Sequence, residues 1–138
     1  MTMEKRDLLV LLFVITLLII IGYSVASNSP KKPKIEGMEY SLWKSDVYGC
    51  NSNREYLIHF IISNKEKFLR YNQNQMIDIL GKPENQTLYN RGQTFFYYYI
   101  KYHPSCGEKN ALSDSEQIKL EIRFDALNRS KEIYVYNL

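Results

Sequence analysis

The apolar and polar positions divide the chain into an apolar N-terminal segment, a polar spacer and a longer region of mixed pattern. Thirteen of the fourteen residues from Leu8 to Ile21 are apolar. The 19 residues of Leu8–Ala26 would extend for about 28 Å as an α-helix, close to the hydrocarbon thickness of a bilayer. We therefore expect residues 1–26 to form a transmembrane signal anchor. The alternative is a signal peptide that is cleaved after Ser24-Val25-Ala26.

The next segment has the composition of a flexible linker. Residues 27–34 consist only of Ser, Asn, Pro and Lys, which favour a solvated and irregular chain. We expect a spacer over residues 27–39. Its three lysines could also lie against anionic lipid headgroups.

The pattern after the spacer predicts one α+β domain over residues 40–138, with helices before strands. Apolar residues at helical spacing follow the possible capping box Ser52-Asn53-Arg54-Glu55, which predicts a helix over residues 54–69. A second helix is expected over Gln73–Leu80, because an Asn precedes it and Gly81 and a nearby Pro follow it.

The hydrophobic period then changes to that of strands. Thr94–Tyr102 is rich in aromatic residues, which favours a strand covered at least partly on both faces. Between Ile118 and Phe124, apolar residues alternate with charged ones, as in a half-buried antiparallel strand. Lys131–Tyr136 is the expected return strand, and Thr87–Asn90 is a possible fourth. The order predicts two helices packed on one face of a three- or four-stranded antiparallel meander.

Length and charge exclude several classes of protein. A chain of 138 residues is too short for a TIM barrel or a doubly wound dinucleotide domain. The net charge is only +3, and no basic stripe accompanies the aromatic residues, so no nucleic-acid partner is expected. The sequence contains no Gly-rich phosphate loop, no His-Glu-x-x-His and no Gly-x-Ser-x-Gly. We therefore expect neither an enzyme nor a cofactor.

The two cysteines, Cys50 and Cys106, predict a disulfide if the domain lies outside the cytoplasm. The bond would close a loop of about 57 residues and contribute roughly 4 kcal/mol in the chain-entropy model. Two other interpretations stay open. Together with His59 and His103 the cysteines could bind zinc, although their spacing matches no known zinc motif and no metal is expected. Cys106 and His103 could instead form a nucleophile pair.

The aromatic strand is the candidate surface for recognition, because Tyr combines apolar area with a hydroxyl group and is enriched at interfaces. The candidate binding residues are Tyr97, Tyr98, Tyr99 and Tyr102. Alternation places Tyr97 and Tyr99 on one face of the strand, and Tyr98 and Tyr102 on the other. One face must pack on the helices, and the other is either an ordinary sheet surface or a protein-binding face.

Three short motifs in this order resemble a known family. A helix ends at Leu80-Gly81-Lys82-Pro83, a turn with Gly92 precedes Tyr97-Tyr98-Tyr99, and Leu120–Asp125 runs into a turn and a final strand. Over about residues 54–138 the chain resembles the SmpA/OmlA (BamE-like) family, whose fold is shared in outline with β-lactamase inhibitor domains. The resemblance implies a non-enzymatic binding or assembly module of the bacterial envelope. The chain departs from the family in having no lipid-acceptor cysteine, and no site residue is transferred.

Together these patterns predict a single-pass protein of the bacterial cell envelope, held in the membrane through residues 8–26. Its C-terminal domain would lie outside the cytoplasm and bind, or help to assemble, another protein. One alternative is a secreted inhibitor-like module, released when the signal is cleaved. Another is a small thiol-dependent enzyme or redox protein that uses Cys106.

Overall fold

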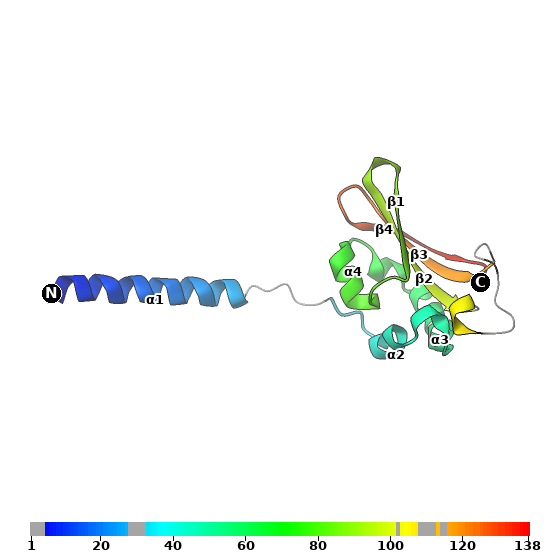
Figure 1. Ribbon diagram of the computed structural model, residues 1–138, viewed down its shortest axis with the longest axis horizontal. Helices are drawn as coiled ribbons and strands as arrows, with labels where there is room; N and C mark the ends of the chain where they lie inside the picture. The colour runs from blue at the N-terminus through cyan, green and yellow to red at the C-terminus, as the bar shows by residue number, and fades with distance from the viewer. Residues whose placement is uncertain (1–4, 28–32, 102, 108–112, 114–115) are drawn as a thin grey trace. The chain divides into compact units, whose positions relative to one another are not determined.

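The computed structural model describes residues 5–27, 33–101, 103–107, 113 and 116–138. The chain separates into two units, residues 1–31 and residues 32–138 (Figure 1).

The described residues of the first unit form one helix, as the sequence predicts. Helix α1 spans Lys5–Ser27, 23 residues, and its described side chains, from Arg6 to Gly22, are all exposed. The hydroxyl of Thr16 donates to the carbonyl of Phe13 at 2.8 Å, so this polar group is satisfied within the helix. Among the residues that the structure describes, no helix combines the length and the apolarity needed to cross a membrane.

Of the two helices predicted for the second unit, Gln73–Leu80 is confirmed with the same bounds, whereas the one over residues 54–69 is shorter than predicted. The helices of this unit are the α-helices α2 (Tyr40–Ser45), α3 (Asn53–Ser63) and α4 (Gln73–Leu80), and the 3₁₀ turns η1 (Val47–Gly49) and η2 (Lys65–Phe68). The predicted helix over residues 54–69 is therefore α3 followed by η2. At the break, the side-chain amide of Asn64 competes for the carbonyl of Phe60, and its backbone amide is shared between the carbonyls of Phe60 and Ile61.

The predicted N-terminal cap is confirmed for α4 but not for α3. Helix α4 has the expected cap at Asn72, with a reciprocal hydrogen bond to Gln75. Ser52, by contrast, makes no capping hydrogen bond with its side chain. The buried carboxylate of Asp46 takes that role in α3, accepting from the amides of Asn51 at 2.6 Å and Arg54 at 2.8 Å.

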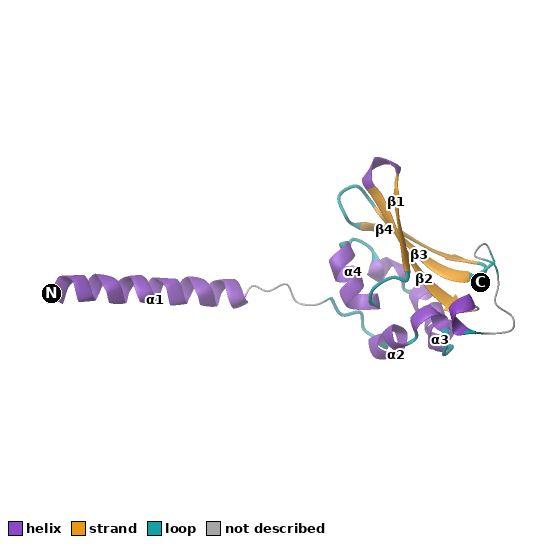
Figure 2. Ribbon diagram, in the orientation of Figure 1, coloured by secondary structure: helices purple, strands orange, loops and turns teal. Residues whose placement is uncertain are grey.

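The sheet is an antiparallel meander in the order β1-β2-β3-β4, which confirms the α+β class and the four-stranded form of the prediction (Figure 2). Its strands are β1 (Asn85–Tyr89), β2 (Gln93–Lys101), β3 (Ile118–Phe124) and β4 (Ser130–Tyr136). The turn η3 (Asn90–Gly92) joins the first two strands, and η4 (Pro104–Cys106) follows β2.

The helices pack on one face of this sheet, called here the inner face. Alternate residues of the two central strands point into the core: Phe96, Tyr98, Ile100, Leu120, Ile122 and Phe124. The helical side of the same core includes Trp43, Leu57, Ile58, Ile61, Met76, Ile79 and Leu80. The period-two pattern of the strands therefore sets which side chains are left for the opposite face.

A glycine allows η1 to approach β2 closely. Gly49 has φ +70°, and a Cβ atom there would lie 2.0 Å from the carbonyl oxygen of Ile100. The next residue, Cys50, is bonded to Cys106, with the two Cα atoms 5.3 Å apart. The predicted disulfide is confirmed, and it ties the start of the helical region to the segment after β2.

Candidate functional site

The sheet face opposite the helices carries the aromatic and charged side chains that alternate with the core residues. We call it the outer face and define it by nine residues. They are Tyr89, Phe95, Tyr97, Lys119, Glu121, Arg123, Glu132, Tyr134 and Tyr136, drawn from all four strands. Most of these side chains are half-buried, and Tyr134 is 42% exposed.

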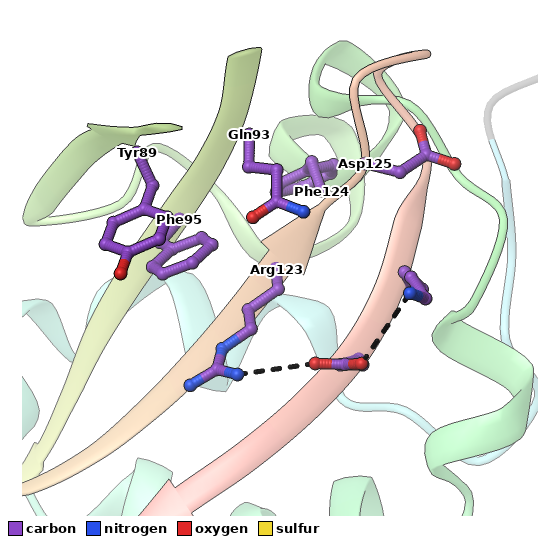
Figure 3. Close-up of a pocket in the computed structure, with 8 residues that line it drawn as sticks. Tyr89, Gln93, Phe95, Arg123, Phe124 and Asp125 are labelled. Atoms are coloured by element: carbon purple, nitrogen blue, oxygen red, sulfur yellow. Dashed lines mark hydrogen bonds and ion pairs between the residues drawn. The ribbon is translucent and has the colours of Figure 1, made fainter. Parts of the chain in front are cut away.

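Arg123 lies at the centre of the outer face. The strand register places it between Phe95 on β2 and Glu132 on β4. Its guanidinium carbon is 5.1 Å from the centroid of the Phe95 ring and 4.5 Å from that of Tyr134, within the range of cation–π attraction. Nη1 also pairs with the carboxylate of Glu132 at 3.4 Å (Figure 3).

Beneath Arg123 lies a carboxylate that is almost fully covered. Glu121 is only 5% exposed although it belongs to the outer face. Its Oε1 accepts from Nε of Arg123 and, at 3.3 Å, from the hydroxyl of Tyr136. Nη2 of Arg123 donates to that same hydroxyl oxygen at 3.1 Å, so the three groups form a closed network. A buried carboxylate is tolerated here because an opposite charge and hydrogen bonds compensate it.

The network shifts the pKa values of two groups on the outer face, Arg123 and Tyr97. Burial by itself lowers the pKa of Arg123, but the hydrogen bond and charge of Glu121 outweigh it and raise the pKa above its ordinary value. Burial is the main cause that raises the pKa of Tyr97, and Glu121 adds to it. Near neutral pH Arg123 is therefore charged and Tyr97 is neutral.

A hollow of about 400 Å³ lies next to Arg123 at the hairpin end of the sheet. It is lined by Tyr89, Gln93, Phe95, Arg123, Phe124, Asp125, Lys131 and Glu132. The rings of Tyr89 and Phe95 stack on one side of it, with centroids 5.3 Å apart (Figure 3). Arg123 and Lys131 both pair with Glu132, and Asp125 pairs with Arg129 outside the lining, so the hollow offers aromatic walls and satisfied polar groups rather than a net charge.

The four predicted binding tyrosines do not share one surface. Tyr97 lies on the outer face, with the ammonium of Lys119 5.5 Å from its ring centroid. Tyr98 is fully buried on the inner face, where its hydroxyl donates to the carbonyl of Gly81 at 2.9 Å. It therefore belongs to the core. Tyr99 is 6% exposed, and Tyr102 lies outside the described residues.

Tyr99 belongs to a separate cluster beside the disulfide. The ring of His103 lies 4.3 Å from the rings of both Tyr48 and Tyr99. Both cysteines are bonded to each other, so Cys106 carries no free thiol. Within the described part of the chain no group of His, Cys, Asp or Glu residues is arranged to hold a metal ion. His59 is exposed on α3.

The central residue of the outer face was not among the sequence candidates. The sequence does indicate this position, because the alternation in β3 places Arg123 on the sheet face opposite to that of Ile122 and Phe124. The same alternation in β4 exposes Tyr134 and Tyr136 on that side.

Comparisons with known proteins add no assignment: no family model matches the chain, and no similar curated protein or solved structure is found.

Proposed function

We propose that this protein is a membrane-tethered, non-enzymatic envelope protein that binds another protein through the outer face of its sheet. The observation that carries the proposal is Arg123, held between the rings of Phe95 and Tyr134 beside an open hollow. Aromatic residues and Arg are enriched in the centres of protein interfaces and among the residues that dominate binding energy. A stacked, hydrogen-bonded Arg loses little freedom when a partner covers it.

Charge and shape favour a protein over a small ionic ligand. The cations of the face are matched by Glu121 and Glu132, so there is no excess charge to attract an isolated anion. The hollow next to Arg123 is open and walled by two stacked rings, which suits an aromatic or aliphatic side chain of a partner.

The binding proposal is tested by site-specific photo-crosslinking in the native host. A photoreactive amino acid replaces Tyr134 in one variant and Tyr56 in the control; Tyr56 is on α3 and is 73% exposed. We expect one discrete crosslinked protein from position 134 and none from position 56. The product should disappear when Arg123→Ala is added. Equal products from both positions, or a product unaffected by Arg123→Ala, would refute the proposal.

The tether is proposed from the sequence of Leu8–Ala26 alone, because no helix among the described residues meets the length and apolarity needed to cross a membrane. An exposed run of Leu, Ile, Val and Phe side chains is unfavourable in water, at roughly 25 cal/mol for each Å² of apolar surface. Thr16 is the one polar residue of Leu8–Ile21, and because its hydroxyl is bonded within the helix it does not oppose burial of this stretch in lipid. The disulfide supports an oxidising compartment for the C-terminal unit.

Membrane extraction and intact mass test the tether together. We expect the full-length chain to stay in the membrane fraction after alkaline carbonate and to be released by detergent. Alkylation without reduction should leave its mass unchanged, because both sulfurs are bonded. A soluble chain that lacks residues 1–26 would replace the tether by the secreted, inhibitor-like module. The resemblance to the SmpA/OmlA (BamE-like) family agrees with a tethered module and stays a prediction.

A further inference from the structure

Strand β1 has a free edge. It pairs with β2 on one side, and among the described residues no strand pairs with its other side. All five of its residues are exposed, including Leu88 at 79% and Tyr89 at 57%. The β1–β2 hairpin also extends beyond helix α4, so its tip is not covered by the helical layer (Figure 2). An edge of this kind presents unpaired backbone N–H and C=O groups to any strand of matching length.

Three of the usual protections of an edge strand, a charged side chain, a Pro and a bulge, are absent from β1. Its sequence, Asn-Gln-Thr-Leu-Tyr, contains no charge and no Pro. Its register with β2 runs without a bulge from Asn85 to Tyr89. Proteins normally guard exposed edges with such features, because an unguarded edge pairs with other chains.

The opposite edge of the sheet is guarded. At the start of β4, the backbone N–H and C=O of Ser130 are both taken, by Tyr71 and Arg70, at 2.8 Å each. The next two residues of β4 are the charged Lys131 and Glu132. The contrast between the two edges within one sheet singles out β1 as the strand available for pairing.

We infer that two copies of this protein join through their β1 strands, antiparallel, around a two-fold axis at Thr87. Each copy contributes its four-stranded sheet, and the dimer has one continuous sheet of eight strands. The inference does not depend on the partner proposed for the outer face.

The β1 sequence suits a second copy of itself. In this register Thr87 meets Thr87, Asn85 meets Tyr89, and Gln86 meets Leu88. Every pair joins side chains of the same sheet face, and no like charges are brought together. Thr–Thr pairs are favourable across strands, and the two-fold axis makes the contact self-complementary, as in most homodimers. A net charge of only +3 for each chain adds little repulsion.

The length of the contact sets its strength. Five residues on each side make a smaller contact than standard interfaces, which bury about 1,200–2,000 Å². The dimer is therefore reversible and depends on concentration. If the chains share a membrane, confinement raises their effective concentration and favours the dimer.

Disulfide trapping of the full-length protein in detergent tests the register directly. In Thr87→Cys the two new thiols face each other, with Cα atoms about 4.5–5.5 Å apart, within the range that a disulfide spans. The control is Arg91→Cys, at the equally exposed hairpin tip. Eight residue positions would separate its two copies along the strands, roughly 26 Å, which is too far for a bond.

In a thiol redox buffer we expect a linked dimer for Thr87→Cys, several times more abundant than for Arg91→Cys. Equal linking of both variants would mean random collision, and no linking would mean that β1 does not pair with itself. Either result overturns the inference. Sedimentation equilibrium supplies a second test, in which Thr87→Lys brings two ammonium groups together and should shift the protein to monomer. A wild-type protein that is monomeric throughout, or a Thr87→Lys variant that dimerises as wild type does, also overturns it.

Discussion

The buried ion pair between Arg54 and Glu84 gives the sharpest test of the energetics of this fold. Both side chains are nearly inaccessible, at 2% and 4% exposure, and they form two parallel hydrogen bonds of 2.9 and 2.8 Å. Arg54 also donates to the carbonyls of Trp43 and Tyr99. The pair therefore joins α3 to α2, to β2 and to the segment that precedes β1.

Glu84→Gln removes the counter-charge while it keeps the size and shape of the side chain. It leaves the guanidinium of Arg54 buried without a compensating charge, a change that costs about 3–5 kcal/mol in folded proteins. For a unit of about 100 residues this corresponds to a fall in Tm of roughly 12–20 °C. The matched control is Glu55→Gln. Glu55 pairs with Lys101 at the same distance, 2.8 Å, but the two side chains are 40% and 25% exposed, so we expect a loss of about 1 kcal/mol or less.

Fluorescence of Trp43 is the natural signal for the assay. It is the only tryptophan of the chain, it is fully buried, and its ring centroid lies 5.1 Å from the guanidinium carbon of Arg54. Thermal and denaturant unfolding should be followed on the full-length protein in detergent with its disulfide intact. If Glu84→Gln lowers the free energy of unfolding by no more than Glu55→Gln does, burial does not set the strength of this pair and the reasoning is wrong.

Three further predictions concern the backbone, the disulfide and one turn. Gly49→Ala should destabilise the fold by more than about 3 kcal/mol, because the added Cβ meets the backbone of β2. Gly92→Ala, with a similar φ of +73° and open space around it, should lose only about 1 kcal/mol in the same denaturation assay. Replacing Cys50 and Cys106 together by Ser should lower the free energy of unfolding by roughly 4 kcal/mol, measured against the oxidised wild type. A backbone hydrogen bond from Arg129 is the main cause that lowers the pKa of Asp125 below 3.8. The ionised carboxylate of Asp125 therefore stabilises the fold above that pH, and this stabilisation is lost as the pH falls through the lowered pKa. A profile of unfolding free energy against pH for Asp125→Asn should lack the loss of stability that Asp125 causes in acid.

Strand β3 and helix α4 could be predicted from the sequence with their observed bounds, whereas α2 and the extent of α3 could not. The alternation over Ile118–Phe124 coincides with β3, because a half-buried strand must place every second residue in the core. The helix predicted over residues 54–69 breaks at Asn64, whose side chain competes for a helical carbonyl. The cap of α3 could not be found from adjacent residues, because Asp46 reaches it from the segment that follows α2.

The candidate site was predicted only in part, for a related reason. The many tyrosines of β2 indicate the correct sheet. However, successive residues of a strand point to opposite faces, so Tyr97 and Tyr98 cannot lie on the same surface, and Tyr98 is buried in the core. Arg123, the central residue of the outer face, lies in β3, whose sequence has the usual alternation of apolar and charged residues of a half-buried strand. Its role depends on the lateral register of β2, β3 and β4, and register is not visible in any single segment.

The way Arg123 is held bears on how strongly such a face can bind. A free arginine loses about 2 kcal/mol of rotamer entropy when a partner fixes it, and this loss is subtracted from the binding free energy. Here Glu121 and Glu132 already fix the guanidinium from two strands, and the rings of Phe95 and Tyr134 cover its faces. Most of that entropy is therefore lost on folding, where the core of the inner face compensates for it. The outer face can then use its remaining aromatic area for affinity, and the fixed direction of Arg123 for specificity.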